Sequence, residues 1–590
     1  MTLKESQRLE NAWRLNKARL LDHRQPGGYW QGELSTSALS TALAAAALSH
    51  AGSTKVDLAL SGLEWLAQNQ NTDGGWGDTT ISHSNISTTA LVLASFRITR
   101  REKEFANTVA KAQEWLRAKY GADFSLAKTV KERYGKDHTF SVPILATCAI
   151  ADMVPWKEVP SLPFELGCLP QSWFRFLGLP VVSYALPALL AIGQCIHHHQ
   201  ASRVLPLRWL RDLCRGRANK VLAKIQPTNG GFLEATPLTA FVALTLSASG
   251  LGQTPVVLQC LDFLEKSARP DGGWAIDTNL ATWVTSLSVN ALASSGELDT
   301  LEDKSLLAEW ILNQQYRTRH PYTGADPGGW SWTPLPGGVP DADDTPGALL
   351  ALTHLGVPPG EWLDNGVKWL SGLQNRDQGM PTFCRGWGTL PFDRSGCDLT
   401  AHTLRAIAPW YLDEIYPVSS EVQRRLGPDM ERLYDGGLYF LYNQQSPEGA
   451  WLPLWFGNQF APEETNPVFG TTRVLAAFRD LGMTSDSRAL AGVRYLEQAQ
   501  NHDGGWGGAP GCPSSLEETG LALDVLCAFT TGPNVLHRGL LWLINAVENG
   551  QLENPTPIGF YFARLWYWER LYPVIFALGG LGRVRRSLKP

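Results

Sequence analysis

The sequence predicts an all-α protein made of two α/α barrels, each built from concentric rings of helices. Three observations support this fold class: a recurring helix–turn–helix segment, the presence of two kinds of helix, and the lack of sustained strand-like alternation. A chain of 590 residues is too long for one ordinary core. We therefore expect two large domains, each with inner helices wrapped by outer helices.

One segment recurs along the chain. Residues 62–76, Gly-Leu-Glu-Trp-Leu-Ala-Gln-Asn-Gln-Asn-Thr-Asp-Gly-Gly-Trp, are echoed by residues 492–506. Each copy predicts a helix that ends near Gln, followed by a Gly-rich turn that an aromatic residue closes. Clear adjacent copies recur about every 40 to 65 residues, which is typical of helix-pair repeats. Weaker copies end at Trp30, Phe232, Trp274, Trp330, Trp387 and Trp451.

The helix after each turn differs from the helix before it. Residues 90–96 and 285–291 are apolar on nearly every face, as inner helices must be, whereas the preceding helices carry charge and suit an outer ring. Ser, Thr or Asp residues open the inner helices, and we expect their side chains to act as N-caps. These openings lie at residues 87–89, 344–345, 398–400, 471–472 and 518–519.

The repeats fall into an early group and a late group, with a transition near residues 278–285. We predict one barrel domain from residues 22–284. The other barrel is predicted from residues 1–21 together with residues 285–590.

Composition narrows the classes of function. A net charge of -5 and a pI near 6.2 leave no basic excess, so nucleic acid is not an expected partner. The 9 cysteines are scattered without a CxxC pair, as in reduced intracellular proteins. Residues 1–24 lack the apolar core of a signal peptide, and the longest apolar stretch, residues 181–192, is broken by Pro187. We expect a cytoplasmic protein without a transmembrane helix.

A cluster of carboxylates precedes one inner helix. Asp341, Asp343 and Asp344 lie within four residues, and Pro346 suits the first helical turn, so the acids belong at the helix mouth. Crowded like charges raise one another's pKa and keep one proton bound at neutral pH. A protonated carboxyl in an apolar cavity is what alkene protonation requires. Helix capping and magnesium binding are the alternative readings.

The stretch Pro-Gly-Gly-Trp-Ser-Trp at residues 327–332, followed by Asp-Ala-Asp-Asp-Thr at residues 341–345, resembles the acid-motif region of class II terpene cyclases of the squalene–hopene cyclase family. The repeated turns resemble the QW motifs of that family. The resemblance runs from about Leu20 to Arg583 and implies a divergent member with the α/α-barrel fold of terpenoid cyclases and protein prenyltransferases. It also implies that Asp343 is the proton donor, that Asp341 and Asp344 support it, and that no cofactor is needed.

The family also places a histidine on a neighbouring helix against the acid. Asp398-Leu-Thr-Ala-His402 matches this pattern, and the i, i+4 spacing puts both side chains on one helical face. The resemblance implies that His402, as a cation, hydrogen-bonds the donor carboxyl. Cys384, Cys397, Asp398 and His402 could instead suggest zinc, as in protein prenyltransferase β-subunits. Those subunits have more widely spread ligands and lack the acid cluster, so no metal is predicted.

Aromatic residues are abundant, with 23 Trp, 21 Phe and 15 Tyr. Trp76, Trp274 and Trp506 close repeat turns and are expected to pack between helices. The resemblance implies that a smaller set faces the cavity, where ring faces stabilise a carbocation by about 2 kcal/mol or more once desolvated. That set is Trp283, Trp332, Trp455, Phe469, Tyr561 and Trp568.

Several positions depart from the family pattern. Leu390 and Leu565 stand where hopene cyclases usually carry tyrosine, and the helices at residues 35–41 and 87–93 lack the family's acids. Those acids belong to a polar network that manages termination. Residues 458–467 are an insertion close to the expected cavity. The start of the reaction is therefore better supported than its product.

The resemblance implies an isomerase- or lyase-type cyclase that protonates and cyclises a linear isoprenoid such as squalene. One alternative is a copalyl-type prenyl-diphosphate cyclase, which would need Lys or Arg and Mg²⁺ at the cavity mouth. Another is a non-catalytic helical-repeat protein that binds lipid. Residues 203–214 are basic and apolar on alternate faces, and residues 583–589 are basic, so we expect a peripheral, one-sided contact with the inner face of a membrane. A homodimer is also expected.

Overall fold

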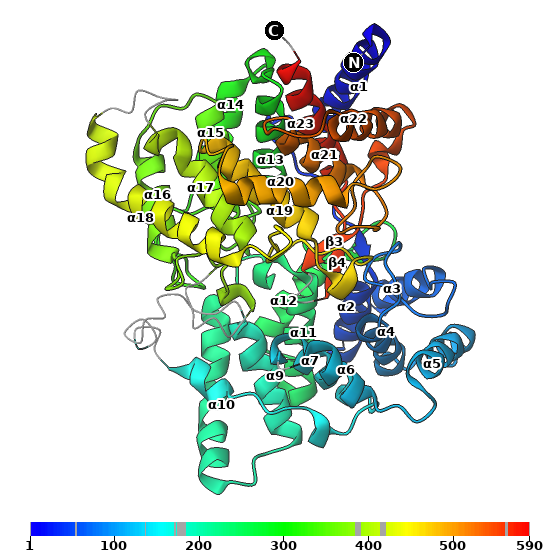
Figure 1. Ribbon diagram of the computed structural model, residues 1–590. Helices are drawn as coiled ribbons and strands as arrows, with labels where there is room; N and C mark the ends of the chain where they lie inside the picture. Colours follow the sequence, from blue (N-terminus) through cyan, green and yellow to red (C-terminus); the bar gives the residue numbers. More distant parts are fainter. Residues whose placement is uncertain are drawn as a thin grey trace.

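The computed structural model describes residues 2–52, 56–135, 137–169, 173, 185–383, 391–412, 420–560 and 564–588 (Figure 1). Helices dominate, and the all-α prediction is confirmed. The strands form two short antiparallel pairs, β1 (Thr36–Ser37) with β2 (Trp274–Ala275) and β3 (Ile558–Phe560) with β4 (Leu565–Tyr567). In Figure 1, one helical body (green to red, with the blue α1) lies above another (blue to teal).

The upper body has a closed inner ring of six helices, because each packs on the next and the last packs on the first. These helices are nearly fully buried, as their apolar sequences predict. They are α13 (Ala281–Ser294), α15 (Asp344–His354), α17 (Cys397–Tyr411), α19 (Pro467–Asp480), α21 (Leu516–Leu526) and α23 (Tyr572–Ser587).

An outer ring of helices packs against these inner helices, and each outer helix buries only one face. The outer helices are α1 (Leu3–Asp22), α14 (Lys304–Asn313), α16 (Glu361–Leu373), α18 (Ser420–Gln444), α20 (Ser487–Ala499) and α22 (Pro533–Glu548). The chain's first helix therefore completes the barrel formed by its C-terminal half.

The lower body repeats this plan. Its inner ring closes through α2 (Ala38–His50), α4 (Ile86–Ile98), α7 (His138–Ile150), α9 (Leu186–His199) and α11 (Thr236–Leu246). Around them lie α3 (Val56–Gln68), α5 (Ala106–Tyr120), α6 (Leu126–Tyr134), α10 (Leu205–Ile225) and α12 (Pro255–Lys266). Among the described residues, no helix is long and apolar enough to cross a membrane.

The repeated turn joins an outer helix to the next inner helix through its tryptophan. The Trp506 indole N–H donates to the carbonyl of Leu496, at 2.7 Å, and its backbone N–H donates to the Thr519 hydroxyl on α21, at 2.9 Å. Gln500 Nε2 donates to the carbonyls of Gly504 and Val535, which ties the turn to α22. The same indole and threonine contacts recur at Trp30, Trp76, Trp274, Trp330 and Trp451, so the predicted packing role is confirmed.

The prediction that these threonines are N-caps is wrong. Thr519 lies inside α21, whose N-cap is Ser515, and Thr89 lies inside α4, whose N-cap is Asn85. A threonine one turn into the helix can accept the tryptophan N–H from the turn, whereas the earlier polar residue satisfies the free amides of the helix end.

The predicted domain boundary at residue 284 lies inside α13. The upper core contains residues of α1, Trp30, Leu34 and most buried apolar residues from Ala275 onward, including Trp283 and Val284. The lower core is formed by residues between Ala38 and Trp274, and Tyr322, Val339, Phe383 and Phe392 also pack into it. One continuous buried helix belongs to one core, so the change of core precedes α13.

Candidate active site

A cavity lies between the two bodies, where the N-terminal ends of both inner rings face each other. The empty volume of this cavity, including the open solvent at its mouth, is about 1570 Å³. The wall is mainly apolar, and its carboxyl groups belong to Asp277, Asp341, Asp343 and Asp344. Among the described residues, the lining includes no lysine or arginine. Ten of the described aromatic residues line it: Tyr134, Phe140, Phe241, Trp283, Trp332, Phe383, Phe392, Trp455, Phe456 and Tyr567.

The acid cluster forms the N-terminus of α15. Asp343 is the residue before the helix, and its side chain stays 18% exposed because it faces the cavity. The Asp341 Oδ1 accepts the backbone N–H groups of Asp343 and Asp344, at 2.8 and 2.7 Å. Asp341 therefore caps the helix and holds the backbone of the central aspartate in place.

All three carboxyls have raised pKa values. Burial raises the pKa of Asp341 to about 7 and that of Asp343 to about 6. Burial also raises the pKa of Asp344 well above its usual value, and the charges of Asp341 and Asp343 add to that effect. The cluster thus holds its protons to higher pH than exposed aspartates do, as expected for carboxyls removed from water.

His402 contacts the central acid, as predicted. Its Nδ1 lies 2.8 Å from the Asp343 Oδ1, and α17 packs beside α15. The prediction that His402 is a cation is not supported. Burial lowers the pKa of the imidazole well below its usual value, and the charges of Arg473 and Arg405 lower it further. A neutral imidazole with its proton on Nδ1 would donate it to the carboxyl Oδ1 and leave the acid proton on Oδ2.

Asp398 lies one helical turn before His402 but has another partner. Its Oδ1 accepts the backbone N–H of Leu454 at 2.9 Å. That bond fixes the segment leading to Trp455, a residue of the cavity wall. Burial raises the pKa of Asp398 to about 6. The structure thus connects Asp398 to the wall, not to the proton donor.

Three of the six predicted aromatic residues line the cavity. Trp283 donates its indole N–H to the Tyr572 hydroxyl at 3.0 Å, and Trp455 donates to the Thr382 hydroxyl at 2.9 Å. Trp332 lies beside Phe383, with ring centroids 5.8 Å apart. These partners hold the rings against the cavity. Tyr561, Leu390, Trp387 and Cys384 lie outside the described residues.

Two predicted wall residues lie elsewhere. Phe469 packs behind Phe456, which faces the cavity, and the two ring centroids are 4.3 Å apart. Trp568 follows β4, whose Leu565 and Tyr567 face the cavity. Successive side chains of a strand point to opposite faces, so Trp568 points away. The wall position belongs to Tyr567.

The family models match both halves of the chain. The model for the squalene-hopene cyclase C-terminal domain matches residues 280–586, and that for the N-terminal domain matches residues 14–242. The chain belongs to the squalene–hopene cyclase family. The change of core between residues 274 and 275 lies between the two matches.

Relatives of this squalene–hopene cyclase family member are distant. Enfumafungin synthase of Hormonema carpetanum is 25% identical, over 85% of this chain and 42% of that protein. A squalene–hopene cyclase of Bradyrhizobium diazoefficiens is 25% identical, over 51% of this chain and 48% of that protein. The chain thus spans less than half of these curated relatives. The solved ent-copalyl diphosphate synthase from Streptomyces platensis, 18% identical with a TM-score of 0.60, shares the fold over 98% of this chain and 99% of its own.

Several site residues were missed by the sequence reasoning. Phe383, Phe392 and Phe456 lie in irregular segments without a periodic pattern, so no sequence signal marked them. Asp277 follows the turn closed by Trp274, and its Oδ1 has no hydrogen-bond partner among the described residues. Tyr567 could have been found from the two-residue period of a strand.

The zinc alternative has little support in the described part of the chain. No group of three or more His, Cys, Asp or Glu side chains there is arranged so that it could hold a metal ion, and Cys384 lies outside the described residues. Cys397 is buried, which raises the pKa of its thiol, and thiolate formation is disfavoured.

Proposed function

We propose that this squalene–hopene cyclase family member is a class II terpene cyclase that protonates a terminal isoprene unit of a linear polyprene. The observation that carries the proposal is the Asp343 carboxyl, with its raised pKa and its His402 partner, facing an aromatic cavity. A non-catalytic lipid-binding protein has no need of such an acid.

The chemistry follows from this arrangement. The Asp343 O–H bond breaks, and its proton bonds to one carbon of the terminal alkene. The alkene π electrons form the new C–H bond, and the other carbon is left as a tertiary cation. Each following alkene attacks the cation, and the ring faces of Trp283, Trp332 and Trp455 stabilise the charge as it moves. The carboxylate left behind accepts the His402 N–H. Loss of a proton or addition of water ends the sequence.

The wall favours a hydrocarbon substrate over a prenyl diphosphate. A buried diphosphate needs cations or many donors, and the described lining residues include no lysine or arginine. We expect product from squalene without added Mg²⁺, measured by mass spectrometry of the extracted hydrocarbons. Product only from geranylgeranyl diphosphate, and only with Mg²⁺, would establish the copalyl-type alternative.

A membrane-facing surface would admit such a substrate. The start of α10 exposes Trp209, which is 67% accessible, and Leu213, which is 82% accessible. Leu166 is also exposed, on the 3-10 helix Phe164–Cys168 that packs against α10. The α10 helix also packs on α9, which supplies Ala188 to the cavity wall. An apolar patch of this kind on a basic helix fits the interface of an anionic bilayer.

Vesicle flotation tests this membrane contact. Leu213→Glu should lower binding to vesicles of phosphatidylglycerol and phosphatidylcholine. Leu15→Glu, at an exposed position on α1 in the other barrel, is the matched control and should bind like the parent. Equal binding by all three proteins would refute the contact. The homodimer stays a prediction, for which sedimentation of the purified protein is the measurement.

A further inference from the structure

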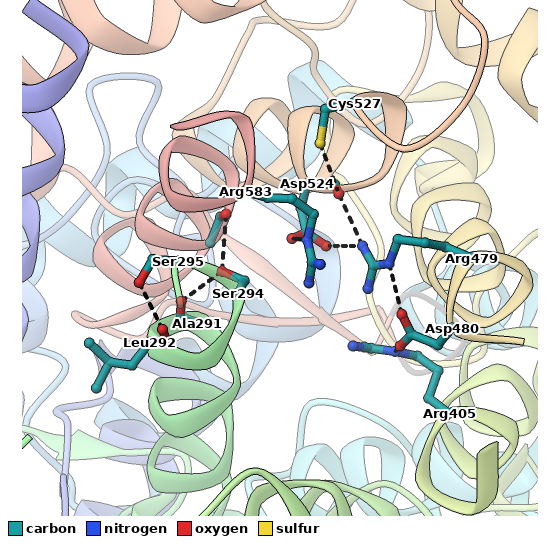
Figure 2. Close-up of polar contacts among 11 residues, drawn as sticks. Ala291, Leu292, Ser294, Ser295, Arg405, Arg479, Asp480, Asp524, Cys527 and Arg583 are labelled. Atoms are coloured by element: carbon teal, nitrogen blue, oxygen red, sulfur yellow. Dashed lines mark hydrogen bonds and ion pairs between the residues drawn. The ribbon is translucent and has the colours of Figure 1, made fainter. Parts of the chain in front are cut away.

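A cluster of ion pairs lies at the C-terminal ends of the upper inner helices (Figure 2). Arg405 and Arg479 both bond Asp480, through Nε atoms at 2.6 and 2.7 Å. Arg479 also bonds Asp524 at 2.8 Å, and Arg583 bonds the same carboxylate at 2.7 Å. Converging helix C-termini carry partial negative charge, which explains the excess of arginine there. Each of these three arginines thus bonds at least one carboxylate of the cluster.

Arg473 also lies in the interior of this barrel, but it makes no ion pair with the described residues of the cluster. It lies on α19, between Phe469 and Arg479, and is only 8% exposed. Its guanidinium carbon is 5.9 Å from the Phe469 ring centroid. Within the described residues, no hydrogen bond or ion pair to Arg473 occurs. A buried cation without a hydrogen-bond or ion-pair partner is unfavourable unless a nearby negative charge stabilises it.

The groups around Arg473 indicate which charge it serves. Burial, and then the charge of Arg405 in the ion-pair cluster, lower the pKa of Arg473 to about 10. The charges of Asp343, Asp398 and Asp524 act in the opposite direction. The α17 helix, which carries Asp398 and His402, packs against α19. Along α19, Arg473 thus lies between Arg479 of the cluster and Phe469, which packs behind the cavity wall.

Other groups near Asp343 supply no fixed positive charge. Asp341 and Asp344 lie on its own segment, and Asp398 lies on α17. Their pKa values are raised, and none of them can carry a positive charge. His402 is neutral, and Tyr567 on β4 has a raised pKa. From α13, the cavity receives the uncharged Trp283.

We infer that Arg473 is a positioning residue for the acid: its fixed charge stabilises the carboxylate that Asp343 becomes when it gives up its proton. The same charge repels the new carbocation from the acid and favours its movement toward the aromatic wall. No bond to the substrate is involved. The inference rests on the proposed cyclase function.

The pH dependence of turnover tests it. The parent should lose activity as the pH rises through the Asp343 pKa of about 6. In Arg473→Met, that decline should move up by about one pH unit, and the low-pH plateau should fall about tenfold, because the acid is weaker. Arg473→Lys should restore both features. Arg488→Met, which removes an exposed arginine on α20, should leave the profile unchanged.

A second readout separates this inference from the cyclase proposal. Infrared difference spectra of the protein without substrate, referenced to Asp343→Asn, report the titration of the Asp343 carboxyl directly. The carboxyl should titrate at higher pH in Arg473→Met and at the parent pH in Arg473→Lys. Unchanged titration in Arg473→Met, or equal shifts in both variants, would overturn the inference whether or not any polyprene is cyclised. If Arg473→Met does not fold, Arg473→Gln takes its place.

Discussion

At the scale of single residues, the site is a carboxyl kept protonated by its surroundings. Asp341 holds the backbone of Asp343 through two N–H bonds, and His402 supports one carboxyl oxygen. Burial, more than the mutual repulsion of the aspartates, raises the pKa of Asp343. The acid therefore keeps its proton to higher pH than an exposed aspartate does, because its environment disfavours the charged form.

Replacing His402 by phenylalanine tests the supporting bond. The variant keeps a ring of similar size but removes the N–H donor to the Asp343 carboxylate. A hydrogen bond to a charged group contributes about 1.5 to 3 kcal/mol, so turnover should fall about 10- to 100-fold. His502→Phe, at an exposed turn position, is the control and should keep parent activity. Parent-level turnover by His402→Phe would show that the bond is not used.

The sequence revealed part of this site. The spacing of Asp341, Asp343 and Asp344 placed them at a helix mouth, and the resemblance to the family selected His402. The charge state of His402 could not be predicted, because it depends on burial and on Arg473 and Arg405 from other segments. The wall position of Phe456 depends equally on tertiary packing.

At the scale of elements, the repeated turn joins one outer helix, one inner helix and the next outer helix. Gln500 illustrates this, since its amide bonds carbonyls of its own turn and of α22. The indole of Trp506 fills the space between the helices and is fully buried. These turns make each barrel a chain of linked helix pairs.

Gln500→Ala should destabilise the protein. The change leaves the carbonyls of Gly504 and Val535 without their amide donor, and the free energy of unfolding should fall by about 1 to 3 kcal/mol. Gln498→Ala, two residues earlier at an exposed position of α20, should change it by less than about 0.5 kcal/mol. Urea titration followed by circular dichroism measures both. Equal stability of the two variants would contradict the linking role.

Most elements could be predicted from helical periodicity and the repeated turns. The hairpin β3–β4 was missed because its strands are short and lie in a stretch rich in aromatic residues. Trp568 was predicted from the family resemblance, whereas the two-residue period of β4 would have indicated Tyr567. The threonines were misread as caps because a cap and a turn-binding threonine differ by only one helical turn.

At the scale of the whole molecule, two barrels enclose the cavity, and the chain's first helix packs with its last. The sequence indicated both barrels through the early and late repeats. It could not locate the change of core, because α13 is apolar throughout and either core would bury it. Packing on α15 and α23 assigns it to the upper barrel.

Buried carboxyls make stability depend on pH. Burial raises the pKa of Glu517 to about 8 and that of Glu569 to about 7, alongside Asp341 at about 7. Because these three carboxyls bind more protons in the folded state than in the unfolded chain between pH 4 and about 8, the stability that they contribute should fall as the pH rises through this range. Asp480 and Asp524, whose pKa values are lowered by arginines, lose their contribution at more acidic pH.

The stabilising contribution of the Glu517 carboxyl should therefore be larger at pH 6 than at pH 8.5. Differential scanning calorimetry at constant ionic strength measures it, as the difference in unfolding temperature between the parent and Glu517→Gln at each pH. The unfolding temperature of Glu517→Gln, relative to that of the parent, should rise between pH 6 and pH 8.5, because only the parent carboxyl loses a proton there. A difference that is the same at both pH values would contradict the protonated state assigned to Glu517.

The central claim is that Asp343 delivers a proton to a terminal alkene. The most direct measurement is turnover of squalene in D₂O, with mass spectrometry of the product. A carboxyl that exchanges with solvent should place one deuteron on each product molecule in the parent protein, and Asp343→Asn should form no product. Product without the added deuteron, or labelled product from folded Asp343→Asn, would contradict the claim.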